Sequence, residues 1–184
     1  MKEELKRELN EINNKASHLD IPNVGNFVLE DIIDKATNLL SKVDLASSSS
    51  NDLEDFAQVY WIKARALNNL NRYEEAFNSY SKSYEIIKKC NGDFNLIELK
   101  SLYGLAWAAA RLTRYEQSMP FCNKFIDLAI KRKCLFVFKD IYVVRGVCNK
   151  ELGNSLKSQK DFHIANSDLA KLFEQNGREM EFNF

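Results

Sequence analysis

Apolar and small residues recur through the middle of the chain at spacings of four and three positions. This is the period of an α-helix that buries one face, and the spacing restarts after a short polar break. The pattern therefore predicts two helices joined by a turn, each with one buried stripe. The two stripes contain Tyr60, Lys63, Ala64 and Leu67, then Tyr73, Ala76, Tyr80 and Ser83.

The same pattern occurs three times. The turn segment Leu70–Tyr73 recurs 42 residues later as Leu112–Tyr115, and Leu152-Gly153 follows another 40 residues on. A small residue stands at the same place in each first helix, which lets the paired helices approach closely. The second copy contains Leu102, Leu105, Ala106, Ala109, Tyr115, Ser118, Cys122 and Phe125, and the third contains Tyr142, Arg145, Gly146, Asn149, Ser155, Ser158, Phe162 and Ala165.

These copies resemble the tetratricopeptide repeat family, most plainly where Tyr142–Gly146 is followed by Leu152-Gly153. The resemblance covers about two thirds of the chain. It implies an all-α fold, an α-solenoid of stacked helix-turn-helix repeats that form a right-handed superhelix. The copies lack the family's final proline and are longer than its usual repeat of about 34 residues. They are therefore closer to the long-repeat type found in kinesin light chains.

The register divides the chain into three parts. Three repeats are expected over residues 52–174, at about 52–91, 95–133 and 134–174. Residues 1–46 are expected to form an N-terminal helical cap with a degenerate repeat, which closes the apolar end of a stacked array. Residues 175–184 are expected to form a C-terminal tail.

Local signals give the boundaries of the cap. A helix is predicted from about Lys2 to His18, with an apolar face suited to packing, and a second stripe runs through Ile33 and Ala36. The serine-rich stretch Ala46–Ser50 predicts a flexible link. The spacing Asn51-x-x-Glu54 fits a capping box, so the first full repeat is expected to begin there. The apolar run 134–138 also resembles a strand, but the repeat register favours a helix.

Composition excludes several classes of protein. Lys and Arg together number 26, as do Asp and Glu, so the net charge is zero. Such a balance argues against a nucleic-acid binder, which needs an excess of positive charge. No run approaches the roughly 18 apolar residues that cross a bilayer, and the charged N-terminus does not resemble a signal peptide. We therefore expect a cytoplasmic protein without membrane insertion, with its four cysteines reduced and mostly packed.

Candidate chemistry is sparse. The two histidines, His18 and His163, have no Cys, His or carboxylate neighbours at the spacing of a metal site. The sequence contains neither a glycine-rich phosphate loop nor a nucleophile motif. We therefore expect no metal, no cofactor and no catalytic residue, and the protein is predicted not to be an enzyme.

The first helix of each repeat predicts a binding face. In stacked repeats these helices line the concave side, and residues about a third of a turn from the core stripe point into it. Aromatic anchors would hold an apolar side chain there, and the cations would hold an acidic one. The expected partner-binding residues are Trp61, Arg65, Asn68, Lys100, Tyr103, Trp107, Arg111, Val143, Val147 and Lys150.

An alternative is that these aromatic side chains pack on neighbouring helices, on the N-terminal helix or on the C-terminal tail. Some family members hold chaperone tails with Lys and Asn at these places. Because aromatic residues and arginine stand there instead, that role is disfavoured.

Three functions fit this face. The first is an adaptor, a non-enzymatic scaffold that holds a peptide or protein segment in the concave groove. The second is a dedicated chaperone or assembly factor that masks a client protein, similar to secretion chaperones of the tetratricopeptide type. The third is a structural subunit that self-associates, as a homo-oligomer, through the N-terminal helix.

Overall fold

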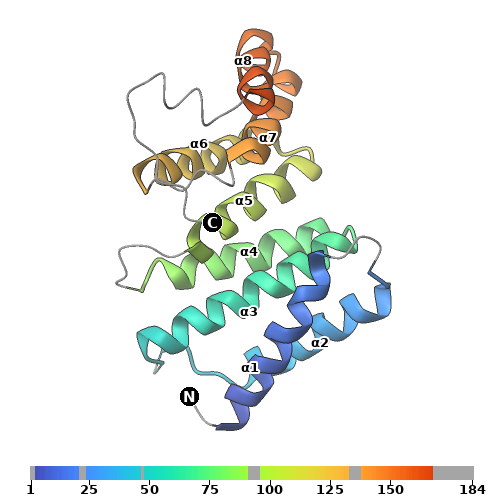
Figure 1. Ribbon diagram of the computed structural model, residues 1–184, viewed down its shortest axis with the longest axis vertical. Coiled ribbons are helices and arrows are strands. Elements are labelled where there is room, and N and C mark those ends of the chain that lie inside the picture. Colours follow the sequence, from blue (N-terminus) through green and yellow to red (C-terminus); the bar gives the residue numbers. More distant parts are fainter. Residues whose placement is uncertain (1–2, 21–23, 47, 91–95, 133–137, 168–184) are drawn as a thin grey trace. The chain divides into compact units, whose positions relative to one another are not determined.

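The computed structural model describes residues 3–20, 24–46, 48–90, 96–132 and 138–167. Within these ranges every regular element is a helix, as Figure 1 shows, so the all-α prediction is confirmed. Most of the run 134–138, with its strand-like composition, lies outside the described residues. The elements are α1 (Glu3–Ala16), η1 (Ser17–Asp20), α2 (Asn26–Ser41), α3 (Ser50–Asn69), α4 (Tyr73–Ile87), α5 (Leu96–Arg111), α6 (Tyr115–Lys131), α7 (Phe138–Glu151) and α8 (Ser155–Asn166).

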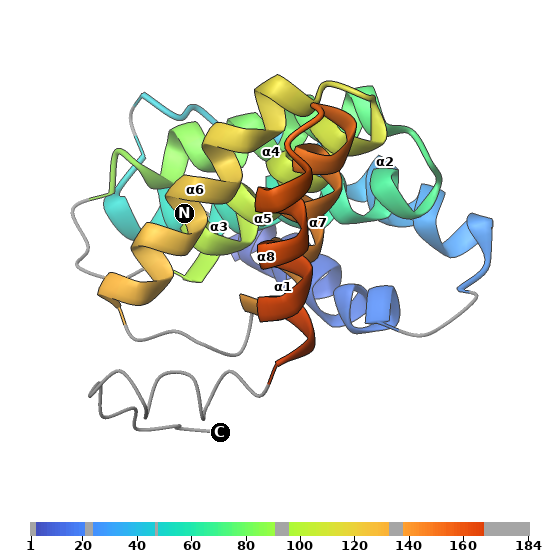
Figure 2. The same ribbon diagram turned by 90° about the horizontal axis from the view of Figure 1, so that it is seen from above.

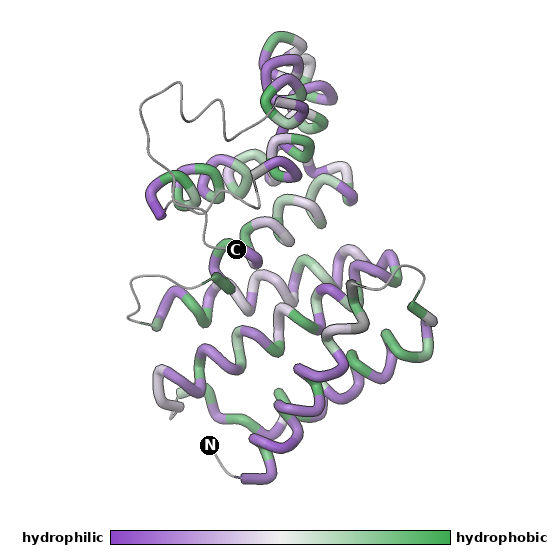
Figure 3. The backbone as a smooth tube through the Cα atoms, viewed as in Figure 1, coloured by the Kyte–Doolittle hydropathy of each residue, from purple (hydrophilic) through white to green (hydrophobic). Residues whose placement is uncertain are grey.

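The chain forms two compact units, residues 1–104 and 105–184, and the boundary between them along the sequence falls within α5. In the first unit α3 packs along α4, α2 packs on α3, and α1 contacts both α2 and α3. In the second unit α7 packs along α8, side by side in Figure 2, and α6 packs on α7. Hydrophobic and hydrophilic residues alternate around most helices in Figure 3, which is why each helix buries only one face.

The N-terminal helix α1 uses its apolar face inside the first unit. Leu9 and Ile12 of α1 are buried, and so is Leu19 of the following element η1. Polar contacts hold α1 on both of its neighbours. Lys42 Nζ of the α2 C-cap lies 2.7 Å from Glu8 Oε1. Two further ion pairs join α1 to α2, one between Lys35 and Glu11 and one between Lys15 and Asp31. Gln58 Nε2 of α3 donates to Asn13 Oδ1 at 2.9 Å.

The start of α3 differs from the prediction. The helix begins at Ser50 and its N-cap is Ser49, whose hydroxyl accepts a hydrogen bond from the Asp52 amide at 3.2 Å. Asn51 therefore lies inside the first turn, and the capping-box assignment was wrong. Just before this helix, the Ser48 hydroxyl donates to the Asp44 carbonyl at 2.7 Å. A serine placed just before the helix competes with Asn51 because both are good N-caps.

The turns inside the three helix pairs have one geometry. Asn71, Thr113 and Gly153 stand at equivalent positions and have φ of 60°, 60° and 76°. In each turn an amide donates to the carbonyl five residues before it, from Arg72 to Leu67 (2.9 Å), Arg114 to Ala109 (2.9 Å) and Asn154 to Asn149 (2.8 Å). This is the Schellman ending of a helix, which needs a left-handed residue. The recurrence of the turn supports the register read from the sequence.

Thr113 is the least suited of the three residues to a left-handed backbone, because its branched side chain is strained there. Replacing Thr113 with glycine is expected to raise the free energy of unfolding by about 0.5–1 kcal/mol, after the greater freedom of glycine in the unfolded chain is counted. Gly153→Ala is expected to lower it by about 1 kcal/mol. Nothing lies within 4 Å of a Cβ built at Gly153, so the backbone alone would cause that loss.

Urea denaturation of both variants beside the wild type tests this pair of predictions. The free energy of unfolding is expected to rise for Thr113→Gly and to fall for Gly153→Ala. A Thr113→Gly protein that is less stable than the wild type would contradict the strain argument.

Small residues lie where the helices of a pair meet. Ala64, Ala76 and Ala106 are fully buried. In the second unit the Ser118 hydroxyl donates to the Ala106 carbonyl at 2.8 Å, and the Ser158 hydroxyl makes the same bond to Gly146 at 2.8 Å. A side-chain hydroxyl reaches a backbone carbonyl on the other helix only where the helices approach closely. The predicted close approach is therefore present in both of these pairs.

The contact between the two helices of the third pair, α7 and α8, is not purely apolar. Arg145 Nη2 lies 2.7 Å from Asp161 Oδ1, and Asn149 Nδ2 donates to Asp161 Oδ2 at 2.9 Å. Arg145 also donates to Asn123 Oδ1 at 2.9 Å and lies over the Tyr142 ring. Asp161 is only 3% exposed. The core between α7 and α8 therefore contains an ion pair where the first pair has Lys63 and Ser79.

Candidate protein-binding site

The ten predicted binding residues lie on the first helices of the pairs, which are α3, α5 and α7. None of them is buried, although Ile62, Ala64 and Leu67, their neighbours on α3, are. Seven are half-buried, namely Trp61, Arg65, Asn68, Lys100, Tyr103, Trp107 and Val143, and three are exposed, namely Arg111, Val147 and Lys150. The first five in chain order belong to the first unit and the other five to the second.

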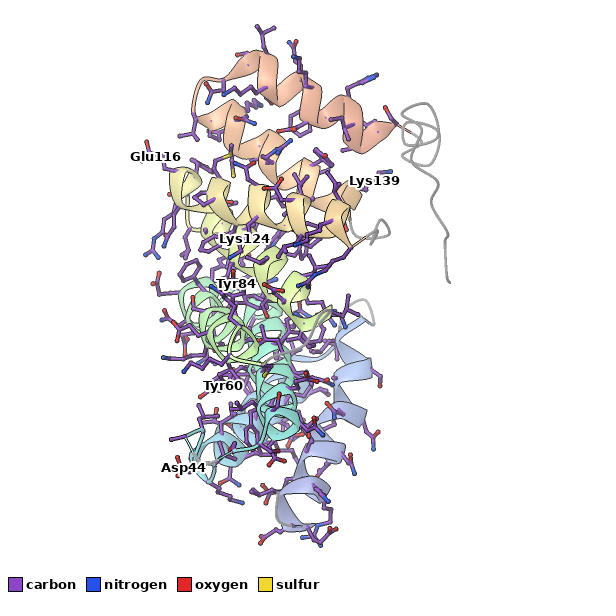
Figure 4. All side chains as sticks on the ribbon, turned by 90° about the vertical axis from the view of Figure 1, so that its left-hand side faces the viewer. Asp44, Tyr60, Tyr84, Glu116, Lys124 and Lys139 are labelled. Carbon is purple, nitrogen blue, oxygen red and sulfur yellow. The ribbon has the colours of Figure 1, made fainter. Side chains whose placement is uncertain are left out.

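In the first unit the indole of Trp61 rests on an apolar cluster. That cluster joins Ala57 of α3 to Ile86 and Ile87 of α4 and Ile97 of α5. Tyr60 and Tyr84, labelled in Figure 4, pack against the same cluster and are also half-buried. Trp61 is therefore partly a packing residue, as the alternative interpretation allowed, and its remaining surface is open to solvent.

Two cations lie over the Trp61 ring. Arg65 Cζ is 5.0 Å from the ring centroid and Lys100 Nζ is 4.7 Å from it. Arg65 is one turn further along α3, whereas Lys100 comes from α5. Both distances are within the range of a cation–π interaction. The sequence placed these three residues on one face but gave no signal that the cations would gather on one ring.

Sequence reasoning took Tyr80 as an ordinary member of the α4 stripe, yet it shapes the α5 side of this face. Its ring contacts Gly104, where an added Cβ would lie 2.4 Å from Tyr80 Cε1. Burial raises the pKa of the Tyr80 hydroxyl, and the positive charge of the nearby Arg65 opposes part of that rise. Gly104 follows Tyr103 directly, so this contact fixes the part of α5 that carries the predicted residue. The signal in the sequence was a glycine inside a predicted helix, because such a glycine makes room for a large residue on the neighbouring helix.

Asn68 adds an unsatisfied group to the α3 face. Its side-chain oxygen is buried and accepts no hydrogen bond within the part of the chain that the structure describes. The face also continues toward the N-terminus, because Gln58 lies three residues before Trp61 and so on the same side of α3. Gln58 is held by Asn13 of α1. The N-terminal helix therefore borders this face at Gln58.

The second unit carries the other five predicted residues. Val143, Val147 and Lys150 follow one another at spacings of four and three on α7, so they share one side of that helix. Val147 is 38% exposed, less than Leu156 of α8, which is 76% exposed and was not among the predicted residues. Trp107 and Arg111 likewise lie one turn apart on α5. The unit thus carries one aliphatic and one aromatic element of the predicted site.

The remaining reactive groups are mostly packed. Burial raises the pKa of the Cys122 thiol to about 12 and also raises the pKa values of Cys148 and Cys90. Thiols with raised pKa are poor nucleophiles at neutral pH. In the described ranges no three His, Cys, Asp or Glu side chains are grouped so that they could hold a metal ion. None of the described helices is both long and apolar enough to cross a membrane.

Comparison with known proteins agrees with the repeat geometry. The family model of the tetratricopeptide repeat matches residues 55–130, which include most of the first two helix pairs. The pair of α7 and α8 lies beyond that match but has the same turn hydrogen bonds. No curated protein matches the sequence significantly. Over residues 55–130, therefore, this chain matches the tetratricopeptide repeat family.

Proposed function

We propose that the chain is a non-enzymatic scaffold that binds a peptide or protein segment on the exposed faces of its first helices, α3, α5 and α7. Tetratricopeptide repeats generally mediate protein–protein interactions. The observation that carries the proposal is that aromatic, aliphatic and cationic side chains on these helices keep part of their surface in solvent, when the residues beside them are buried. Exposed aromatic and arginine residues are the usual anchors of protein interfaces.

The packing of α1 favours this scaffold over self-association through the N-terminal helix. Leu9, Ile12 and Leu19 are buried within the first unit, so they are not available to a second copy unless α1 detaches. The chaperone alternative uses the same faces for a larger client, and no contact of the described residues favours it over the scaffold.

Trp107→Ala and Arg111→Glu test the proposal. Trp107→Ala is expected to weaken partner binding by about 2 kcal/mol, because it removes a large anchor. Arg111→Glu is expected to weaken it as well, more at low salt than at high salt if the bound segment is acidic. The partner is first isolated from the native host with the wild-type chain and then titrated against each variant by calorimetry.

Lys124→Glu is the matched control, because Lys124 is exposed on the second helix α6 (Figure 4) and off the proposed faces. It changes charge as Arg111→Glu does and is expected to leave binding unchanged. If Trp107→Ala instead lowered stability by several kcal/mol and left binding by the folded remainder intact, Trp107 would be a core residue. The face on α5 would then not be a binding site.

A further inference from the structure

The outer face of α8 combines an apolar side chain with a cation. Leu156, Lys160 and His163 follow one another at spacings of four and three, so they share one side of the helix, and all three are exposed. That side points away from α7, because Ser158 and Asp161, which bond to α7, lie on the opposite side of α8. Leu156 is 76% exposed.

The position of Leu156 is acidic in the other two copies of the repeat. It corresponds to Glu74 of α4 and Glu116 of α6. Both of those helices carry glutamate in the first turn, and α8 carries no acidic residue there. Lys157 lies in that turn instead, where a cation opposes the helix dipole and so does not stabilise the helix. The stability of α8 itself therefore does not explain these residues.

Within α8, no exposed carboxylate balances the lysines. Asp161, its one acidic residue, is buried and held by α7. Lys157 and Lys160 make no ion pair or hydrogen bond with any residue that the structure describes. The second helix of the preceding pair differs, because α6 exposes both signs of charge, at Glu116 and Lys124 (Figure 4). The outer face of α8 therefore suits an occupant that is both apolar and anionic.

A segment of that chemistry follows α8 in the sequence. It contains two carboxylates, three large apolar side chains and no cation, in the order Glu179, Met180, Glu181, Phe182, Asn183 and Phe184. The segment lies outside the described residues, and residues 167–178 connect it to the end of α8. A link of this length spans up to roughly 40 Å, whereas α8 is about 18 Å long. The segment can therefore reach any point of the α8 face.

We propose that the segment 179–184 of this chain binds the outer face of α8, with its glutamates at Lys157 and Lys160 and its phenylalanines against Leu156. The inference goes beyond the proposed function, because it concerns a second helix and an occupant from the same molecule. Tethering favours this occupant over a separate protein of the same chemistry, since a short tether gives an effective concentration in the millimolar range. Contacts as weak as exposed ion pairs suffice under that condition.

Nuclear magnetic resonance of the 15N-labelled chain, residues 1–184, tests this contact. Glu179→Lys with Glu181→Lys is expected to lower the ratio of bound to free segment by about tenfold or more, because attraction becomes repulsion. The amide signals of Leu156 and His163, which are distant in sequence from the changes, are expected to shift. The signals of α3 are expected to stay in place, which also checks that the variant is folded.

Charge reversal on the helix gives the reciprocal measurement. Lys157→Glu with Lys160→Glu is expected to shift the amide signals of Phe182 and Phe184. Both lysines are exposed, so the fold is expected to be retained. The matched control is Lys124→Glu with Lys131→Glu, which reverses two exposed lysines of α6 and is expected to leave the signals of the segment unchanged.

Salt and a charge swap test whether the contact is electrostatic. The Debye length falls from about 10 Å at 0.1 M salt to about 3 Å at 1 M, so added salt is expected to shift the His163 signal in the wild type. Either pair of reversals is expected to remove that salt response. The chain with all four reversals again has opposite charges on the helix and on the segment, and it is expected to recover the response.

The location and concentration dependence of the shifts decide the outcome. Shifts on α8 that persist unchanged on about tenfold dilution support the inference, because an intramolecular contact is independent of protein concentration. Shifts that depend on concentration would assign the face to a second copy of the chain and overturn the inference. Shifts on α3 or α5 instead of α8, or none beyond the substituted positions, would overturn it as well.

Discussion

Replacing Asp161 with alanine is expected to lower the free energy of unfolding by about 3–5 kcal/mol. Asp161 accepts hydrogen bonds from Arg145 and Asn149 and is almost fully buried. Without it, the partly buried guanidinium of Arg145 would lose its counter-charge, and the Asn149 amide would lose its acceptor. An uncompensated charge in the protein interior costs more than the lost bonds themselves.

Urea denaturation followed by far-ultraviolet circular dichroism measures this loss. Asp161→Asn keeps the shape and one acceptor, so it is expected to be less damaging than alanine. The double variant Arg145→Met with Asp161→Leu removes both charges and is expected to recover most of the stability. Asp161→Ala with wild-type stability would mean that the ion pair contributes nothing to the packing of α8 on α7.

Replacing Gly104 with valine is expected to cost about 3 kcal/mol, the upper part of the range for an over-packed core. The added Cβ alone would lie 2.4 Å from the ring of Tyr80, and that ring is 4% exposed and has little room to move. Helix propensity acts in the other direction, since glycine is less favourable in a helix than alanine by about 1 kcal/mol. The clash is expected to outweigh this gain.

A graded series gives the control for Gly104. Gly104→Ala should fall between the wild type and Gly104→Val, because it adds the clashing atom without the two methyl groups. Gly25→Ala should have little effect, since nothing lies within 4 Å of its added Cβ and its φ of −64° is ordinary. A Gly104→Val protein that melts at the wild-type temperature would show that Tyr80 can rotate away.

The repeat was readable from the sequence because periodicity reports which residues share a helix face. It placed the turns correctly, and Asn71, Thr113 and Gly153 have the equivalent backbone that the register requires. Periodicity does not report which side chains of different helices meet. Arg145 was therefore placed in the stripe of the third copy, but its ion pair with Asp161 was not predicted.

The same limit applies to the candidate site. Spacing alone placed Trp61 and Arg65 on one face of α3, but their contact with Lys100 depends on how α5 packs. The N-cap at Ser49 was missed because two good caps stand two residues apart, and propensity does not choose between them. The right-handed superhelix, the three-part division of the chain, the shared groove and the cytoplasmic location stay predictions.

The shared turn geometry has a consequence for how such a chain can lengthen. Three different residues, Asn71, Thr113 and Gly153, serve the same backbone conformation and the same hydrogen bonds. A tandem duplication with both ends in equivalent turns, such as residues 72–113 copied in frame, would join a turn to a turn and preserve every backbone bond at the junction. The copied segment would bring its own first helix, with Lys100, Tyr103, Trp107 and Arg111, and so would add exposed surface without a new loop. A single genetic event could thus extend the molecule by a whole helix pair.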